Sequence, residues 1–168
     1  MIHIEAVLLI KMFEGLHDGD LHKIGLQPKM CPAGIWTVGY GHALFVDGKP
    51  LKGSSDKAKA YKMYPGLTED GAYLMLIDDL KTFESLVRKM VRVELNEKQI
   101  GALVSFSYNL GSVALKNSTL LQCVNNHNFK AAADEFAKWN KATVDGIKVI
   151  MKGLTNRRAA EAKLFLSE

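Results

Sequence analysis

Apolar residues recur at helical spacing in two stretches of the chain. The first stretch predicts a helix over residues 4–13, and the second predicts a much longer helix over residues 68–93. In the first, the residues sharing one face are Ala6, Leu9, Ile10 and Phe13; in the second they are Tyr73, Leu76, Ile77, Leu80, Phe83, Val87, Met90 and Val91. The longer helix has room both to link two lobes and to supply part of a core.

Helix-start signals organise the rest of the chain. Thr68 can cap the long helix, with two acidic residues in its first turn. Asn96 and Gln99 fit a capping box, and Leu95 can pack on Ile100 as a hydrophobic staple. Further helices are predicted at 119–125, 128–139 and 154–166, with a loop around residues 143–152.

The amino-acid composition between the first predicted helix and the long one differs from that of the two helices. Eight of the 14 glycines fall within residues 15–53, which indicates turns and close backbone approaches. The best strand candidates are Ile35–Tyr40 and Ala43–Val46, followed by a turn at Asp47-Gly48. We therefore predict a predominantly helical α+β fold of one domain over 1–168. Its parts are a small α/β lobe at 14–66 and a helical lobe made of 1–13 and 68–168, with 68–93 as the linking helix.

Composition and net charge limit the kinds of molecule that the protein is expected to bind. A chain of 168 residues with 48% hydrophobic and 24% charged residues is typical of a globular protein with a substantial core. The net charge of +4 favours polyanionic partners such as nucleic acid, anionic lipid or bacterial wall polymer. An aromatic content of 8% and the lack of a polybasic block argue against nucleic acid. Cys31 and Cys123 form no disulfide framework and no metal-ligand spacing, so we expect neither a metal nor a cofactor.

The first residues, MIHIEAVLLIK, do not resemble a targeting segment. They lack a basic region before the apolar run, and that run, AVLLI, is too short for a signal peptide or a membrane span. We therefore expect no stable membrane insertion and retention in the cytoplasm until another event releases the protein.

Four residues around the glycine-rich stretch could carry chemistry, although each also has an ordinary structural explanation. Glu14 ends the first predicted helix, where a carboxyl that keeps its proton could protonate a leaving group, but a Glu near a helix end is more often solvated. A free Cys such as Cys31 is more often a small buried apolar residue. Thr37 fits a strand, and His42 fits a structural hydrogen-bond donor. The polar run at 17–22 matches no metal motif.

The order of these residues resembles the phage-type lysozymes, the endolysins of the T-even and lambdoid kind. That family places a catalytic Glu at the end of its first helix, followed by an Asp or Cys and, after five further residues, a Thr. Glu14, Cys31 and Thr37 match this order. The resemblance continues along nearly the whole chain. The matching segments are FEGL at 13–16, CPAGIWTVGYGH at 31–42, LNEKQ at 95–99, ALVSF at 102–106, YNLG at 108–111, AAADEF at 131–136, WN at 139–140, GL at 153–154 and RR at 157–158 with Glu161.

The resemblance implies a two-lobed lysozyme-like fold and cleavage of the β-1,4 bond between N-acetylmuramic acid and N-acetylglucosamine. Glu14 would protonate the glycosidic oxygen, and Thr37 would hold a water on the opposite face. Because a thiol is a weak base at neutral pH, we expect Cys31 to position that water first, to act as a base second and as a covalent nucleophile third. An inverting reaction needs the two catalytic groups about 6.5–9.5 Å apart and a retaining one about 5–5.5 Å; the sequence leaves both open.

Substrate-binding positions follow from the same resemblance. Asn109 matches a family amide that contacts sugar, and Tyr108 beside it could pack on a sugar ring. His42 is a further expected substrate-binding residue. Arg157 lies where the last helix of the family brings an arginine near the catalytic Glu, with Arg158 as the alternative. A guanidinium there favours the ionised carboxylate, which opposes proton donation unless burial counteracts it. For Tyr108 and Asn109, a purely structural role is equally open.

One departure from the family concerns the second catalytic group. Sixteen residues separate Glu14 from Cys31, an interval longer than is usual in the family, and the additional stretch is about His17–Met30. Lengthening a loop costs little free energy, about 0.6 kcal/mol per doubling, so the fold need not be disturbed. Asp18 or Asp20 could replace Cys31 in its role. We prefer Cys31 because its five-residue interval to Thr37 is intact.

The expected partner is the glycan strand of peptidoglycan. We expect the protein to be a monomer and to bind no nucleic acid. The expected location is the bacterial host cytoplasm until release to the wall, with delivery in a virion as a second route. One alternative keeps the fold without the activity, as a wall-binding or virion-structural protein. A second alternative, membrane disruption by a basic amphipathic helix, is less favoured because the stripe at 68–93 looks core-facing.

Overall fold

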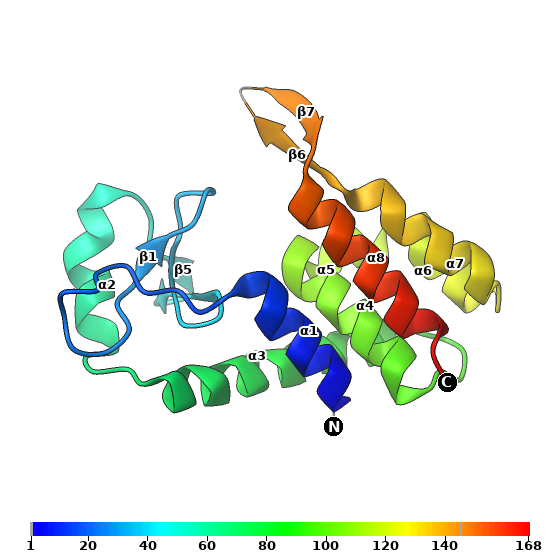
Figure 1. The fold of residues 1–168 in the computed structure, drawn as a ribbon, viewed down its shortest axis with the longest axis horizontal. Helices are drawn as coiled ribbons and strands as arrows, with labels where there is room; N and C mark the ends of the chain where they lie inside the picture. The colour runs from blue at the N-terminus through cyan, green and yellow to red at the C-terminus, as the bar shows by residue number, and fades with distance from the viewer. Residues whose placement is uncertain (1, 145) are drawn as a thin grey trace. The chain divides into compact units, whose positions relative to one another are not determined.

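The computed structural model describes residues 2–144 and 146–168, and the chain divides into two compact units (Figure 1). The smaller unit comprises Glu14–Asp79. The larger unit comprises residues 1–13 and 80–168. The boundary between them falls inside the long helix α3, Glu69–Met90.

The smaller unit contains two small antiparallel sheets. The first has strand order β1-β2-β3, with β1 at Lys29–Met30, β2 at Trp36–Val38 and β3 at His42–Ala43. The second pairs β4, Phe45–Val46, with β5, Lys49–Pro50. Asp47 and Gly48 both have positive φ (51° and 73°), which is the backbone twist that a two-residue hairpin turn requires, so the predicted turn is confirmed.

A compact apolar cluster holds the smaller unit together. Its buried members are Trp36, Val38, Leu44, Leu51 and Ala60. The indole of Trp36 donates to the Gly53 carbonyl at 2.8 Å, so the polar atom of this buried ring has a partner. Ala60 comes from α2, Lys57–Met63, which follows a short 3₁₀ helix at Ser54–Asp56.

In the smaller unit one prediction needs correction and one helix was not predicted. Residues 43–46 do not form one strand, because the chain changes partner at Leu44. The Leu44 N–H donates to Trp36 at 2.9 Å, whereas its carbonyl accepts from Leu51 at 2.8 Å, so one fully buried residue joins two different sheets. The helix α2 was not predicted from the sequence, because residues 57–63 are few and rich in lysine.

The larger unit is a bundle of helices. Its helices are α1 at Ile4–Glu14, the second half of α3, α4 at Glu97–Leu110, α5 at Ser112–Lys116, α6 at Thr119–Asn125, α7 at Phe129–Phe136, a 3₁₀ helix at Ala137–Trp139, and α8 at Lys152–Leu166. α4 packs along α8, and α7 packs on α6 and α8 (Figure 1). Residues 100–107 of α4 are all buried. The expectation of a predominantly helical α+β fold is confirmed.

The predicted helix starts are confirmed by their capping bonds. Thr68 Oγ1 accepts from the Gly71 N–H at 3.1 Å at the start of α3. Asn96 and Gln99 form a reciprocal capping box, with bonds of 2.8 and 3.0 Å between each side chain and the other backbone N–H. These local signals fix where two of the main helices begin.

The loop predicted around residues 143–152 is wrong. β6, Lys141–Val144, pairs with β7, Ile147–Ile150, as an antiparallel hairpin just before α8 (Figure 1). Polar and apolar residues alternate over 141–144 and 147–149, and several of these residues are β-branched, so the sequence carried a strand signal that the loop prediction missed, although the hairpin has no buried face. The short helix α5 was not predicted either.

None of the helices in the described part of the chain combines the length and the apolar character that a membrane crossing requires.

Candidate functional site

Cys31 and Thr37 lie on one face of the β1–β2 hairpin. Lys29 pairs with Thr37 and Met30 with Trp36, and the Cys31 N–H continues the ladder by donating to the Ile35 carbonyl at 2.8 Å. Because side chains alternate between faces, Cys31 shares the face of Lys29 and therefore that of Thr37. The five-residue interval in the sequence is thus a tight hairpin that sets a thiol and a hydroxyl on the same side.

The hydroxyl of Thr37 has a fixed orientation. Thr37 is only 6% exposed, and its Oγ1 donates to the Lys29 carbonyl at 3.1 Å across the hairpin. A hydroxyl has one proton to donate and two lone pairs that accept. Since the proton is engaged by Lys29, Thr37 can only accept a further hydrogen bond.

Glu14 is the last residue of α1 and is half-buried. Its backbone carbonyl accepts from the His17 ring Nε2 at 2.9 Å, and the His17 N–H donates to the Gly39 carbonyl at 2.9 Å. Gly39 directly follows β2. The segment after Glu14 is therefore tied to the strand that carries Thr37.

Asp18 and Asp20 serve the loop between Glu14 and β1. Asp18 Oδ1 accepts from the backbone N–H groups of Asp20 at 3.1 Å and Gln27 at 3.2 Å. Asp20 accepts from the His22 N–H at 3.2 Å and lies 3.6 Å from the Lys23 ammonium. Both carboxylates thus organise the loop backbone, which is the usual role of Asp in turns.

Gly19 lets this loop close on itself. Its N–H donates to the Gln27 carbonyl at 3.0 Å, and a Cβ added at Gly19 would lie 2.1 Å from the Pro28 carbonyl oxygen. We expect Gly19→Ala to lower the free energy of unfolding by at least about 1 kcal/mol, because the backbone must shift. Urea denaturation measures the change. Gly153→Ala is the control, since its added Cβ meets nothing within 4 Å in α8; an equal loss in both variants would contradict the prediction.

His42 is anchored to the long helix within the smaller unit. Its Nδ1 lies 2.8 Å from Asp79 Oδ2, and its ring packs edge-on against Tyr64 with centroids 6.1 Å apart. The side chains of His42 and Asp79 are each 26% exposed. One ring nitrogen is therefore engaged by a carboxylate, which gives His42 a structural contact whatever else it binds.

Tyr108 and Asn109 lie near the end of α4 in the larger unit, and both are half-buried. The Tyr108 ring packs edge-on against Phe83 at 5.3 Å. Asn109 Oδ1 accepts from Arg158 Nη2 at 3.0 Å. Because arginine only donates, the amide oxygen must face Arg158, and the Asn109 amide N–H₂ is directed elsewhere.

A buried charge network connects α8 to α4. Glu161 is fully buried between Arg157 (Nε at 3.2 Å) and Arg158 (Nε at 2.8 Å), and the Ser105 hydroxyl donates to it at 2.7 Å. Burial raises the pKa of the Glu161 carboxyl, and Arg158, Ser105 and Arg157 oppose that rise by favouring the carboxylate. The guanidinium of Arg157 also lies 5.8 Å from the centre of the Phe13 ring. Both arginines therefore belong to the core of this unit.

The sequence did not assign Ser105 a role, since a Ser among apolar helix residues is easily taken as filler. A pair of arginines followed three residues later by a Glu, all facing a helix that carries a buried Ser, is the pattern that could have indicated the network. Within the described residues, Cys31 and Cys123 are free thiols, and no three His, Cys, Asp or Glu side chains cluster as metal ligands.

Comparison with known proteins finds the same architecture. The family model described as phage lysozyme matches residues 19–161. The endolysin of Bacillus phage B103 is 39% identical over 96% of this chain and 52% of its own length, so this chain spans about half of that relative. The endolysin of Acyrthosiphon pisum secondary endosymbiont phage 1 is 32% identical over 97% of this chain and 96% of its own. The muramidase domain of SpmX from Asticaccaulis excentricus superposes with a TM-score of 0.78 at 31% identity, covering 100% of this chain and 99% of that one.

Proposed function

The chain belongs to the phage lysozyme family, and on that premise we propose that it hydrolyses bacterial peptidoglycan as an endolysin-type muramidase. The bond cleaved is the β-1,4 link between N-acetylmuramic acid and N-acetylglucosamine. The observation that carries the proposal is the hairpin that sets the Cys31 thiol and an oriented Thr37 hydroxyl on one face, with the segment after Glu14 bonded to the end of the same strand.

Glu14 acts as the general acid. A half-buried carboxyl at the end of a helix can deliver its proton to the glycosidic oxygen as positive charge develops on the sugar. The leaving sugar then departs as a neutral alcohol, which avoids the cost of an alkoxide.

Thr37 orients the attacking water. Because its proton is engaged by the Lys29 carbonyl, Thr37 accepts a hydrogen bond from the water and leaves a lone pair of that water free for the anomeric carbon. Cys31, on the same face, provides a second contact that positions the water. Its own roles as a base or a nucleophile rank behind this one, because a thiol is a weak base at neutral pH.

We favour Cys31 over Asp18 and Asp20 as the second catalytic group. Each aspartate already accepts backbone N–H bonds within the loop, so turning either one toward a sugar would release those donors. Cys31 has no such structural duty for its side chain among the described contacts.

In the larger unit, the side-chain amide of Asn109 supports a sugar contact. Arg158 holds the amide oxygen, so the amide N–H₂ is the group that remains to bind an acceptor such as an N-acetyl carbonyl. Tyr108 would pack on a sugar ring beside it. We assign Arg157 to supporting this region through Glu161 and Ser105. His42, on β3 of the smaller unit, remains a proposed substrate contact.

The deciding experiment analyses the products released from purified peptidoglycan. The expected result is new reducing ends that, after borohydride reduction and acid hydrolysis, are identified as muramitol. Release of amino groups instead would indicate a peptidase or an amidase, and binding without new ends would support the wall-binding alternative. Gel filtration alongside tests the predicted monomer.

A variant series tests the identity of the second catalytic group. We expect Cys31→Ser to reduce turnover by less than about tenfold, because a hydroxyl can still contact the water. We expect Cys31→Val, which has no polar atom, to reduce turnover by about 10²-fold, within the range of a lost positioning contact. Asp20→Asn should leave turnover within about threefold, since its amide oxygen still accepts from His22. Loss of activity in Asp20→Asn with full activity in Cys31→Val would reverse the assignment.

A further inference from the structure

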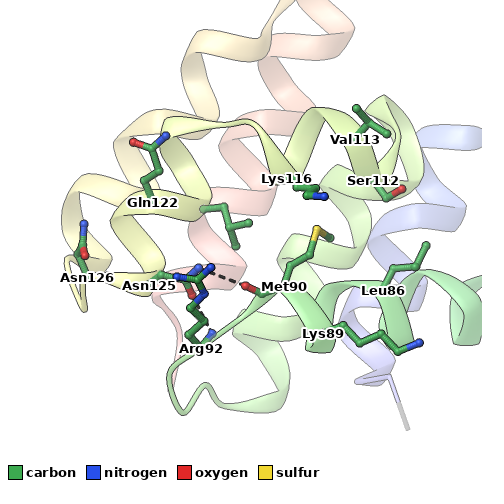
Figure 2. A pocket seen from close by; sticks show the side chains of 11 residues that line it. Leu86, Lys89, Met90, Arg92, Ser112, Val113, Lys116, Gln122, Asn125 and Asn126 are labelled. Carbon is green, nitrogen blue, oxygen red and sulfur yellow. Dashed lines mark hydrogen bonds between the residues drawn. The ribbon is translucent and has the colours of Figure 1, made fainter.

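A pocket of about 660 Å³ opens on the larger unit, between the last turns of α3, the short helix α5 and one face of α6 (Figure 2). None of the residues that line it belongs to the candidate site described above. The pocket therefore needs an explanation of its own.

The lining carries positive charge and no negative charge. Lys89, Arg92 and Lys116 contribute three cations, and no Asp or Glu lines the pocket. All three side chains are exposed, and none has an acidic partner within 4.0 Å among the described residues. The contrast is Arg88, one residue from Lys89, which is bonded to Glu84 at 2.8 Å and is thereby neutralised. Three uncompensated cations around one concavity favour an anionic ligand.

The wall of the pocket is fixed by one side chain. Asn125 in α6 accepts from the Arg92 backbone N–H at 2.8 Å and donates to the Met90 carbonyl at 3.2 Å (Figure 2). The segment that follows α3 is therefore hydrogen-bonded to α6, and the backbone of Arg92 is fixed in position before any ligand binds. Preorganisation of this kind lowers the entropic cost of binding.

The remaining lining is apolar or carries side-chain amides. Met90 and the nearly buried Leu121 form an apolar surface, and Val113, which is 68% exposed, forms part of the rim. The exposed amides of Gln122 and Asn126 offer both donors and acceptors. A matching ligand would combine carboxylates, amide groups and short alkyl groups.

We propose that this pocket binds the peptide stems of peptidoglycan, through the carboxylates of their D-amino acids and the alkyl surface of their alanine residues. The inference rests on the proposed function, because the stems are attached to the glycan that the enzyme would cleave. A glycerol phosphate polymer would satisfy the cations but would leave Met90, Leu121 and Val113 without an apolar partner. A bilayer surface is flat and does not enter a concave pocket.

Stem binding would hold the protein on the wall between cleavage events. A second contact on the same polymer raises the effective concentration of glycan at the catalytic residues. The consequence is specific: the pocket contributes to activity on intact peptidoglycan and contributes nothing on glycan strands from which the peptides have been removed.

The first test measures binding directly. The triple variant Lys89→Gln, Arg92→Gln, Lys116→Gln is compared with Lys130→Gln, Lys152→Gln, Lys163→Gln, which removes the same three charges from exposed positions on α7 and α8. A soluble stem tetrapeptide is titrated into each ¹⁵N-labelled protein. We expect wild type and the control triple to show amide shifts at residues 89–92 and 112–126, and the pocket triple to bind roughly tenfold more weakly, as expected for losing three partly screened charge contacts.

The same titration is repeated with glycerol phosphate oligomers and with vesicles of anionic phospholipid. Tighter binding of either probe than of the tetrapeptide at the pocket amides would overturn the choice of ligand. No binding of any probe would overturn the site itself.

The second test measures reducing ends released from intact peptidoglycan and from amidase-treated, peptide-free glycan. We expect the pocket triple to lose about tenfold in kcat/KM on the intact wall and nothing on the bare glycan, while the control triple is unchanged on both. Equal losses in the two triples would assign the effect to net charge and overturn the inference. Wild-type protein inactive on both substrates would instead refute the proposed function, a result that the binding titration does not share.

Discussion

Glu14→Gln is expected to lower the rate of peptidoglycan hydrolysis by about 10²- to 10⁴-fold, the usual contribution of a positioned general acid. Gln has nearly the same shape as Glu and can occupy the same half-buried position at the end of α1, but it has no proton to give to the glycosidic oxygen. The measurement is the initial rate of reducing-end release from purified peptidoglycan. Circular dichroism checks that the variant is folded, since the Glu14 backbone carbonyl can still accept from His17.

Glu5→Gln is the matched control for this prediction. Glu5 lies on the same helix, and its side chain is 52% exposed and 3.3 Å from the Lys98 ammonium. An exposed ion pair contributes little to stability, so activity and melting should both stay near wild type. Retention of more than about a tenth of wild-type activity in Glu14→Gln would remove Glu14 from the role of proton donor and would favour another carboxylate.

Local signals along the chain were sufficient to predict most of the helices. The caps at Thr68 and Asn96 act over three residues, and the apolar stripe of α3 repeats often enough to outweigh any single exception. The break between β3 and β4 was not predicted, because what causes it comes from elsewhere in the chain. Leu44 joins two sheets through bonds to Trp36 and Leu51, and no pattern within residues 43–46 contains that information.

For the candidate site, spacing was more informative than composition, and the roles of Cys31 and Thr37 stay predictions. The interval between Cys31 and Thr37 is a hairpin whose register places both side chains on one face, and a register of this kind can be counted in a sequence. The roles of Asp18 and Asp20 could not be inferred from spacing in the sequence. Each carboxylate is engaged by the backbone of its own loop, and the loop closes where Gly19 lies against Pro28.

The cations of the larger unit separate into two groups with different surroundings. Arg157 and Arg158 are buried and both contact Glu161, so they contribute to the core, and Arg158 also holds Asn109 in place. Lys89, Arg92 and Lys116 are exposed and surround the pocket of Figure 2 without an acid. Net charge alone treats these residues alike, whereas burial and partners assign the first group to structure and the second to binding.

The buried network should dominate the stability of the larger unit. Removing one partner of a buried ion pair costs about 3–5 kcal/mol, because the remaining charge stays buried without compensation. Glu161→Ala would leave the guanidiniums of Arg157 and Arg158, which are 3% and 1% exposed, together with the Ser105 hydroxyl, without their shared acceptor. We expect the free energy of unfolding to fall by that amount and the melting temperature to fall by roughly 10 °C in a chain of this size.

Glu97→Ala provides the comparison, since it removes a carboxylate from another arginine. Its contact with Arg88 is 2.6 Å long, yet the Glu97 side chain is 49% exposed, so water can replace the lost partner. Its cost should stay below about 1 kcal/mol. Urea denaturation and calorimetry on both variants measure the difference. Similar losses in the two would mean that desolvation does not govern the Glu161 network and that α8 is held to α4 by apolar packing alone.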